Sequence, residues 1–268
     1  MSSNSLPKVT VITIVLNALT VIERTLKSVV TQDYKNLEYL VVDGRSLDGT
    51  LDVIERYRGR ITKIVSEPDG GIYEAMNKGA AMATGEWIIF MNGGDVFVDT
   101  DVVSKVFLNF SCSEFDVIYG DGIICHEGRR SVERSPNRVS FHDGNCFSHQ
   151  SSFIRADVQR EYGFDLAERV AADYDLFLRL YKNDKVFQRV DVIVSEFFTG
   201  GFSNLPPQET IRLRHRIYTK HIPRHSFVLY FRLGKMFAKT LLRNVIPAII
   251  WDGIKRLRDR DKLLQNHQ

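Results

Sequence analysis

Short apolar runs alternate with amphipathic stretches along the first hundred residues. The run 8–16 is rich in β-branched residues and almost wholly apolar, which is typical of a strand covered on both faces. Residues 21–32 then follow the helical period. The same succession recurs, with strands expected at 37–42, 61–66 and 86–91 and helices at 52–57 and 72–83. This alternation predicts a parallel, doubly wound α/β sheet.

The pattern changes in the second half of the chain. We expect one helix over 101–109 and another opening at 171–180. Strands are expected at 117–125, 129–134, 146–154 and 186–198. The first two of these strands read as an antiparallel hairpin, and His149 and Gln150 interrupt the third. A change from βαβ units to hairpins indicates that the second half builds a different face of the same domain.

Composition places the chain among ordinary globular proteins. Its 268 residues are 44% hydrophobic and 26% charged, which is enough to bury a full core. Cys112, Cys125 and Cys146 are odd in number and form no CxxC pair, so we expect reduced thiols and neither a disulfide frame nor a zinc site. We expect no signal peptide at the start and no transmembrane helix, because no uncharged apolar run reaches about 18 residues.

Positive charge gathers at the C-terminal end. Residues 200–268 hold 14 Lys and Arg against 4 Asp and Glu, although the net charge of the whole chain is only +3. A helix would place Arg232, Lys235, Lys239 and Arg243 on one stripe, opposite a face of aromatic and aliphatic residues. Such a helix either lies in an anionic membrane surface or packs on the body with its charged side in water.

The clearest candidate chemistry is the turn Asn92-Gly93-Gly94-Asp95, which follows the expected strand at 86–91. Ligands of open α/β sheets bind outside the carboxyl ends of the strands. A carboxylate at that place is a hard oxygen ligand that suits Mg²⁺ or Mn²⁺ carrying a substrate diphosphate. The alternative is an ordinary turn-forming aspartate.

Other strand ends and helix starts offer further polar groups. Asp43 ends a strand and either makes a turn or accepts hydrogen bonds from a base or ribose, and Ser46 or Asp48 is placed to cap the next helix. Residues 67–79 join a Gly-Gly turn to a helix start suited to phosphate, where Lys78 adds charge. The first strand lacks the G-x-G-x-x-G turn of nicotinamide dehydrogenases, which counts strongly against that class.

Four motifs occur together in an informative order. They are Val42-Asp43-Gly44 with Ser46-x-Asp48-Gly49-Thr50, the stretch 67–79, the turn Asn92–Asp95, and Ala172-Asp173-Tyr174-Asp175. Together they resemble the inverting family 2 glycosyltransferases of the GT-A fold, over about residues 7–203. The most similar members are bacterial enzymes that build exopolysaccharide, capsule or lipopolysaccharide chains, including colanic-acid-type enzymes.

The resemblance implies a nucleotide-sugar bound across the first half. The residues that it assigns to the donor are Asn17, Asp43, Asp69, Asn77, Lys78, Asn92 and Asp95. It makes Asp95 the remaining carboxylate of the family's D-x-D metal motif, whose first position here is Asn92, and it implies Mn²⁺ or Mg²⁺ as cofactor.

The resemblance also assigns the proton acceptor. Asp173 matches the catalytic base, and Ala172 replaces the glutamate that usually precedes it; the alternative role of Asp173 is to cap its helix. His149 is either a core histidine or an acceptor-side residue. The Gly200-Gly201 loop either closes over substrate or is a plain turn.

We therefore expect a GT-A-type domain over 1–204, with its nucleotide-sugar half at about 7–100 and its acceptor half at about 101–204. Residues 205–268 are expected to form a basic amphipathic helical region. The predicted function is transfer of a UDP- or GDP-linked sugar to a saccharide or lipid-linked acceptor in surface polysaccharide synthesis. The enzyme is expected in the cytoplasm, held at the inner face of an anionic membrane through 226–260, with no nucleic-acid partner.

Two alternatives differ from this reading in class. A sugar-nucleotide nucleotidyltransferase would need a long Gly-rich loop with Lys or Arg after the first strand, which residues 17–20 do not supply. A non-catalytic protein that binds anions or membranes through the basic tail would leave the strand-end aspartates without a role, since acidic groups repel phosphate unless a metal is present.

Overall fold

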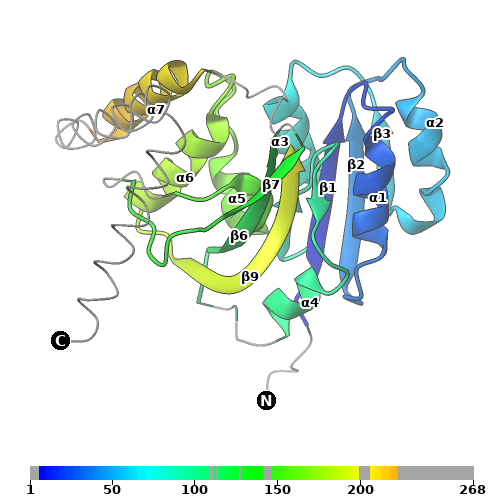
Figure 1. Ribbon diagram of the computed structural model, residues 1–268, viewed down its shortest axis with the longest axis horizontal. Coiled ribbons are helices and arrows are strands. Elements are labelled where there is room, and N and C mark those ends of the chain that lie inside the picture. Colours follow the sequence, from blue (N-terminus) through cyan, green and yellow to red (C-terminus); the bar gives the residue numbers. More distant parts are fainter. Residues whose placement is uncertain are drawn as a thin grey trace, which may run out of the picture. The chain divides into compact units, whose positions relative to one another are not determined.

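The apolar runs of the first hundred residues form parallel strands (Figure 1). β1 (Val9–Val15) lies between β2 (Leu37–Asp43) and β4 (Trp87–Phe90), and β3 (Lys63–Ser66) borders β2. Every residue of β1 is buried, as expected for a strand covered on both faces. The parallel sheet predicted for this half of the chain is confirmed.

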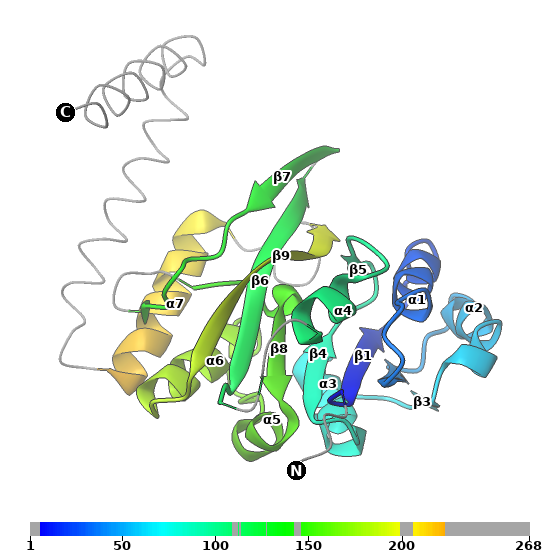
Figure 2. The ribbon, with the colours of Figure 1, turned by 90° about the horizontal axis from the view of Figure 1, so that it is seen from below.

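Helices cover both faces of these strands. α1 (Ile22–Val30) and α2 (Thr50–Glu55) share a core with the odd-numbered residues of β1, and α3 (Ile72–Met82) packs on the opposite face (Figure 2). A Cβ added to Gly79 of α3 would lie 2.6 Å from Ile12 Cγ2. Glycine therefore lets α3 approach β1 closely.

The computed structural model describes residues 6–108, 112, 114–126, 128–141, 146–198 and 206–222. The remaining described elements of the first compact unit are β5 (Val96–Phe97), α4 (Val102–Phe107), β6 (Val117–His126), β7 (Arg129–Glu133), β8 (Ser152–Arg155), α5 (Ala156–Tyr162), α6 (Ala172–Lys182) and β9 (Phe187–Phe198). Short 3-10 turns occur at Arg58–Arg60 and His149–Ser151.

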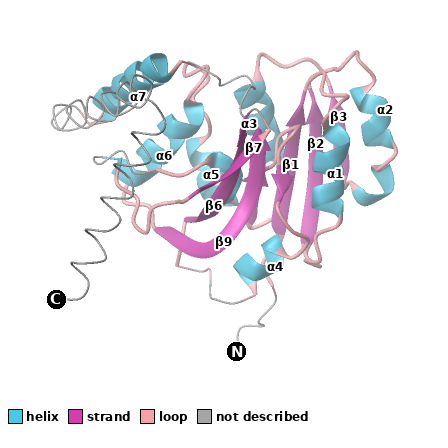
Figure 3. Cartoon of the chain, viewed as in Figure 1, coloured by secondary structure: helices cyan, strands magenta, loops and turns pink. Residues whose placement is uncertain are grey.

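One mixed sheet joins the two halves of this unit (Figure 3). Its strand order is β3-β2-β1-β4-β8-β6-β9-β5, and β7 pairs with β6. β8 is antiparallel to both β4 and β6, whereas β6 and β9 are parallel. β6 and β7 form the predicted hairpin. The expected mostly parallel sheet with an antiparallel second portion is confirmed.

Two local expectations are wrong. The strand expected at 146–154 is a 3-10 turn over His149–Ser151 followed by the short β8, because Ser151 N–H bonds to Ser148 O and Ser152 Oγ donates to His149 O at 2.8 Å. Neither Ser46 nor Asp48 is the N-cap of α2. That position belongs to Gly49 at φ 94°, while Asp48 accepts the Thr50 N–H at 3.0 Å.

A second compact unit holds residues 142–144 and 205–268. Its described helix is α7 (Pro207–His221), which begins with a proline and carries several basic residues. The predicted basic stripe from Arg232 to Arg243 and the glycines Gly200 and Gly201 lie outside the described residues. No helix in the described part of the chain has the length and apolar character that a membrane crossing requires.

Candidate active site

The segments that follow β2 and β4 meet at the end of β1. Gly44 N–H donates to Val15 O at 2.8 Å, and Gly93 N–H donates to Ile14 O at 2.9 Å. These bonds put the two segments on either side of β1, at the carboxyl edge of the parallel strands. Neighbouring strands lie about 4.8 Å apart, so the segments of Asp43 and Asp95 are on the order of 10 Å apart.

Asp43 is fully buried and holds a turn. Its carboxylate accepts hydrogen bonds from Ser46 N–H at 3.1 Å and from Ser66 Oγ at 2.6 Å. Asn17, with φ 47°, supports the same loop, because its Oδ1 accepts the Leu47 N–H and its own N–H donates to Ser46 Oγ. Direct contact of Asp43 or Asn17 with a nucleotide stays a prediction.

Asp69 lies at the same end of the sheet. A Cβ added to Gly44 would be 2.8 Å from Asp69 Oδ2, so this carboxylate lies against the backbone that follows Asp43. Asp69 Oδ1 accepts the Gly71 N–H at 3.0 Å. The structure thus brings Asp69 against Gly44, the residue that follows Asp43, and a nucleotide contact of Asp69 stays a prediction.

Asn77 and Lys78 have partners within the protein. The Asn77 side chain donates to Phe164 O at 2.9 Å and accepts the Phe164 N–H at 2.8 Å. Lys78 forms an ion pair with Glu67 at 2.7 Å. Asn77 therefore fastens α3 to the segment that leads toward α6. Donor contact by either residue stays a prediction.

The Asn92–Asp95 turn holds two buried oxygen-bearing side chains that the protein only partly compensates. Burial raises the pKa of Asp95, which is 9% exposed, to about 7, and the charges of His149 and Arg24 and the backbone of Asn92 lower it only in part. Asn92 Oδ1 is a buried oxygen without a hydrogen-bond partner. A buried carboxylate that is short of positive charge and an unpartnered amide oxygen fit the ligand chemistry of Mn²⁺ or Mg²⁺.

Asp173 occupies the first turn of α6, and its side chain is 30% exposed. Its Oδ1 accepts the Tyr174 N–H at 2.8 Å and faces the Tyr73 hydroxyl at 3.4 Å. Its Oδ2 lies 3.2 Å from His149 Nδ1. Burial and the Asp173 charge raise the pKa of Tyr73, so its phenol stays a hydrogen-bond donor.

His149 joins Asp173 to the turn that holds Asp95. Its Nδ1 faces Asp173, and its Nε2 lies 3.4 Å from Asn92 Nδ2. One imidazole thus links the Asp173 carboxylate to the side-chain amide of Asn92. Asp173 is not turned away into solvent, and Asp95 lies on its side of the sheet.

Sequence reasoning did not single out two residues of this site. Tyr73 lies in the stretch 67–79, but its position one residue into α3 gave no sign of its contact with Asp173. Arg24 lies on α1, donates to Gly94 O, and places its guanidinium carbon 3.7 Å from the centroid of the Phe198 ring. Helical periodicity alone cannot distinguish Arg24 from a solvated surface residue.

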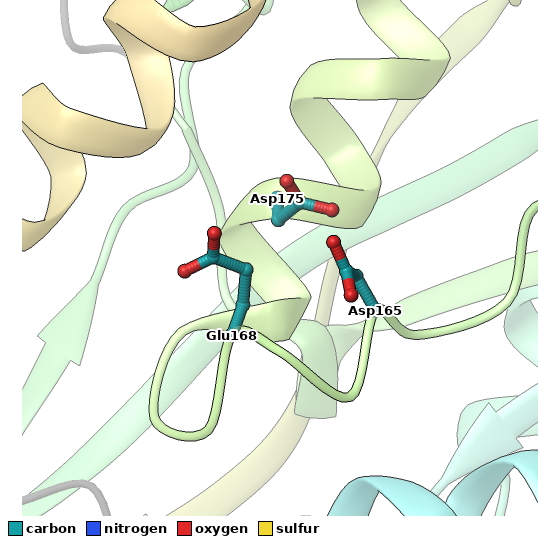
Figure 4. A group of neighbouring side chains, drawn as sticks. All are labelled: Asp165, Glu168 and Asp175. Atoms are coloured by element: carbon teal, nitrogen blue, oxygen red, sulfur yellow. The ribbon is translucent and has the colours of Figure 1, made fainter.

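A second acidic group lies nearby in sequence (Figure 4). One carboxylate oxygen from each of Asp165, Glu168 and Asp175 lies within 4.8 Å of the others. Arg179 pairs with Asp175 at 2.7 Å and also donates to Tyr162 O and Gly163 O. We interpret this group as a salt-bridged brace for the chain that precedes α6.

The chain is similar in sequence to known glycosyltransferases. The family model "Glycosyl transferase family 2" matches residues 10–171. A PGL/p-HBAD biosynthesis glycosyltransferase of Mycobacterium tuberculosis is 28% identical over 248 residues, which cover 90% of this chain and 96% of that protein. The putative glycosyltransferase EpsE of Bacillus subtilis is 25% identical over 292 residues, covering 99% of this chain and 100% of that protein.

Solved structures share the fold. S. aureus TarS 1-349 in complex with UDP-GlcNAc has a TM-score of 0.66 at 19% identity, covering 86% of this chain and 73% of that one. The mannosyltransferase PcManGT from Pyrobaculum calidifontis, in complex with GDP-Man and Mn²⁺, has a TM-score of 0.63 at 17% identity, covering 97% and 81%. The expected GT-A architecture is confirmed.

Proposed function

Because the chain belongs to glycosyl transferase family 2, we propose that it moves a sugar from a UDP- or GDP-linked donor to a saccharide or lipid-linked acceptor. The product is a growing surface polysaccharide, and the transfer inverts the anomeric carbon. The family match favours transfer over the two alternatives raised from the sequence, a nucleotidyltransferase and a non-catalytic anion-binding protein.

Inverting transfer is one in-line displacement. The acceptor oxygen bonds to the anomeric carbon while its proton passes to the Asp173 carboxylate, and the bond to the diphosphate breaks with its electron pair leaving on the nucleoside diphosphate. Asp173 suits this role because it is partly exposed while its two oxygens are held from separate elements. A rigidly held base costs less to align with the attacking hydroxyl.

One observation carries the proposal: His149 faces both Asp173, at 3.2 Å, and Asn92, at 3.4 Å. The proposed base and the Asn92–Asp95 turn therefore lie on different edges of one imidazole ring. A donor whose diphosphate meets the turn would present its sugar toward Asp173.

We assign a divalent cation, Mn²⁺ or Mg²⁺, to Asp95 with Asn92 Oδ1 as a second oxygen ligand. The assignment rests on the raised pKa of Asp95 and the unpartnered amide oxygen. When bound, such an ion supplies positive charge that offsets the charge of the leaving diphosphate. The remaining proposed donor contacts are Asn17, Asp43, Asp69, Asn77 and Lys78.

The acceptor is proposed to be lipid-linked, with the enzyme at the inner face of the cell membrane. Support comes from the charge pattern of residues 226–260, whose basic and aromatic faces suit an anionic membrane surface. Gly200 and Gly201 are proposed to close over bound substrate.

A donor screen tests the function. The full-length protein is incubated with a panel of UDP- and GDP-sugars, with and without Mn²⁺, and both release of nucleoside diphosphate and the melting temperature are measured. We expect one donor to be hydrolysed slowly and to raise the melting temperature in the presence of Mn²⁺. A panel in which no nucleotide-sugar does either would contradict the proposal.

A further inference from the structure

We propose that His149 is a positioning residue, which sets the Asp173 carboxylate relative to the Asn92–Asp95 turn. The inference rests on the proposed function, since it assigns Asp173 as the base. His149 acts through Asp173 and not on the substrate. It would connect the donor half of the domain, through Asn92, with the acceptor half, through α6.

The backbone holds His149 in place. The residue opens the 3-10 turn His149–Ser151, and its carbonyl accepts a hydrogen bond from Ser152 Oγ at 2.8 Å. Ser152 begins β8, the strand that pairs with both β4 and β6. Only 15% of the imidazole is exposed, so surrounding residues restrict its motion.

The contact with Asp173 determines which ring nitrogen must donate. The Nε2 edge of the ring faces the Asn92 side-chain amide at 3.4 Å, which leaves Nδ1 to face Asp173. An ionised Asp173 can only accept, so His149 Nδ1 must carry the proton. His149 then donates to Asp173 Oδ2, on the side of the carboxylate away from Tyr174.

Both distances are long for hydrogen bonds, at 3.2 and 3.4 Å. Such contacts of catalytic groups often shorten when substrate is bound. The ring is therefore placed to align Asp173 during turnover while contributing little to the stability of the unliganded fold. A purely structural histidine would show the opposite balance.

Two amide variants separate the contacts. In His149→Asn, the side-chain nitrogen occupies the position of Nδ1 and can still donate to Asp173. In His149→Gln, the side-chain nitrogen occupies the position of Nε2, so it meets Asn92 and the hydrogen bond from residue 149 to Asp173 is lost. We expect His149→Gln and His149→Ala to lower kcat by about 10²-fold, and His149→Asn by less than about tenfold. The donor KM should change little in all three.

Matched measurements decide the interpretation. His126→Gln, at the exposed end of β6, is the control and should behave as the native protein. Melting temperatures show whether each variant folds. If the native protein turns over donor while His149→Gln keeps native kcat, or if His149→Asn is as impaired as His149→Gln, the positioning role is overturned. If the native protein turns over no donor, the proposed function fails instead.

A spectroscopic test does not depend on activity. Long-range ¹H–¹⁵N correlation spectra of the full-length protein report which nitrogen of His149 carries the proton. We expect a proton on Nδ1 and loss of that signature in Asp173→Ala. A ring whose Nδ1 carries no proton would overturn the proposal.

Discussion

Asp95 shows how a single residue can favour function over stability. Burial raises the pKa of its carboxyl to about 7, whereas an aspartate in an unfolded chain has a pKa of about 3.9. Between these pH values the folded protein retains a proton that the unfolded chain has released. The Asp95 contribution to the free energy of unfolding therefore falls as pH rises from about 4 to about 7.

Replacing this carboxylate tests the assignment. Asp95→Asn removes the buried charge, so in the absence of metal at pH 8 the variant should melt at a higher temperature than the native protein, by about 2–4 °C for each kcal/mol regained. Mn²⁺ should raise the melting temperature of the native protein and leave that of Asp95→Asn unchanged. Thermal denaturation with and without Mn²⁺ measures both. An equal Mn²⁺ shift in the two proteins would place the ion elsewhere.

At the scale of single residues, the sequence predicted the aspartates better than their surroundings. Asp95 and Asp173 stand out because one ends a buried strand and the other opens a helix. The contacts of Asn77 could not be foreseen, because its partner Phe164 is 87 residues away and bonds through its backbone. Lys78 was expected to meet phosphate, and nothing local in the sequence revealed its pairing with Glu67.

Glu38 in β2 forms hydrogen bonds to β1 and to the turn before β4. It is 4% exposed and accepts hydrogen bonds from Thr10 Oγ at 2.6 Å and Thr84 N–H at 2.7 Å, with Lys8 Nζ at 3.1 Å. Burial would raise the pKa of Glu38, but these hydrogen bonds outweigh it and lower the pKa to about 2. The stabilisation is present above the unfolded pKa of about 4.3 and is lost as pH falls through about 2.

Neutralising Glu38 should therefore loosen β1, β2 and the turn before β4. We expect Glu38→Gln to lower the free energy of unfolding by about 1.5–3 kcal/mol at pH 7, the usual worth of hydrogen bonds to a charged group. The matched control is Glu55→Gln, whose pairing with Arg58 is exposed to solvent and should contribute little to stability. Urea denaturation measures both, and equal losses would remove the special role of Glu38.

At the scale of elements, the strands with the clearest apolar pattern were the ones that the sequence predicted correctly. β1, β2 and β4 could be predicted because their short, continuous apolar runs do not show the helical repeat of polar residues. The failure at 146–154 has a physical cause, since Phe147, Phe153 and Ile154 are buried like strand residues while the chain turns at His149–Ser151. That turn directs His149 toward residues from two distant segments, which periodicity cannot register.

At the scale of the whole molecule, the Asn77 side chain joins the two halves of the first unit through hydrogen bonds to the Phe164 backbone. Its paired hydrogen bonds to Phe164 fix the chain that leads to Asp173. We expect Asn77→Ala to lower the free energy of unfolding by about 1–3 kcal/mol. Calorimetric titration with the donor tests the contact proposed for the same side chain. We expect weaker binding, and native affinity in a destabilised variant would leave Asn77 with the structural role alone. If affinity is lost and stability is not, Asn77 binds the donor directly, as the sequence resemblance implies.

The C-terminal region is predicted to bring the enzyme to its acceptor. Replacing Arg232, Lys235, Lys239 and Arg243 by Gln removes charges worth about 1 kcal/mol each near an anionic surface. We expect binding to vesicles with anionic lipid to fall by at least about 10²-fold, while donor hydrolysis stays native. Co-sedimentation measures binding, with neutral vesicles as the control. Undiminished binding to anionic vesicles would show that this stripe does not contact the membrane.

The central claim is that Asp173 removes the acceptor proton. The most direct measurement compares kcat and donor affinity of Asp173→Asn with those of the native protein, using the donor that the screen identifies. The account predicts a kcat lower by about 10²–10⁴-fold, with donor affinity nearly unchanged, because the amide keeps the shape of the side chain and cannot accept the proton. A kcat within about tenfold of native, in a variant that folds and binds donor normally, would contradict it.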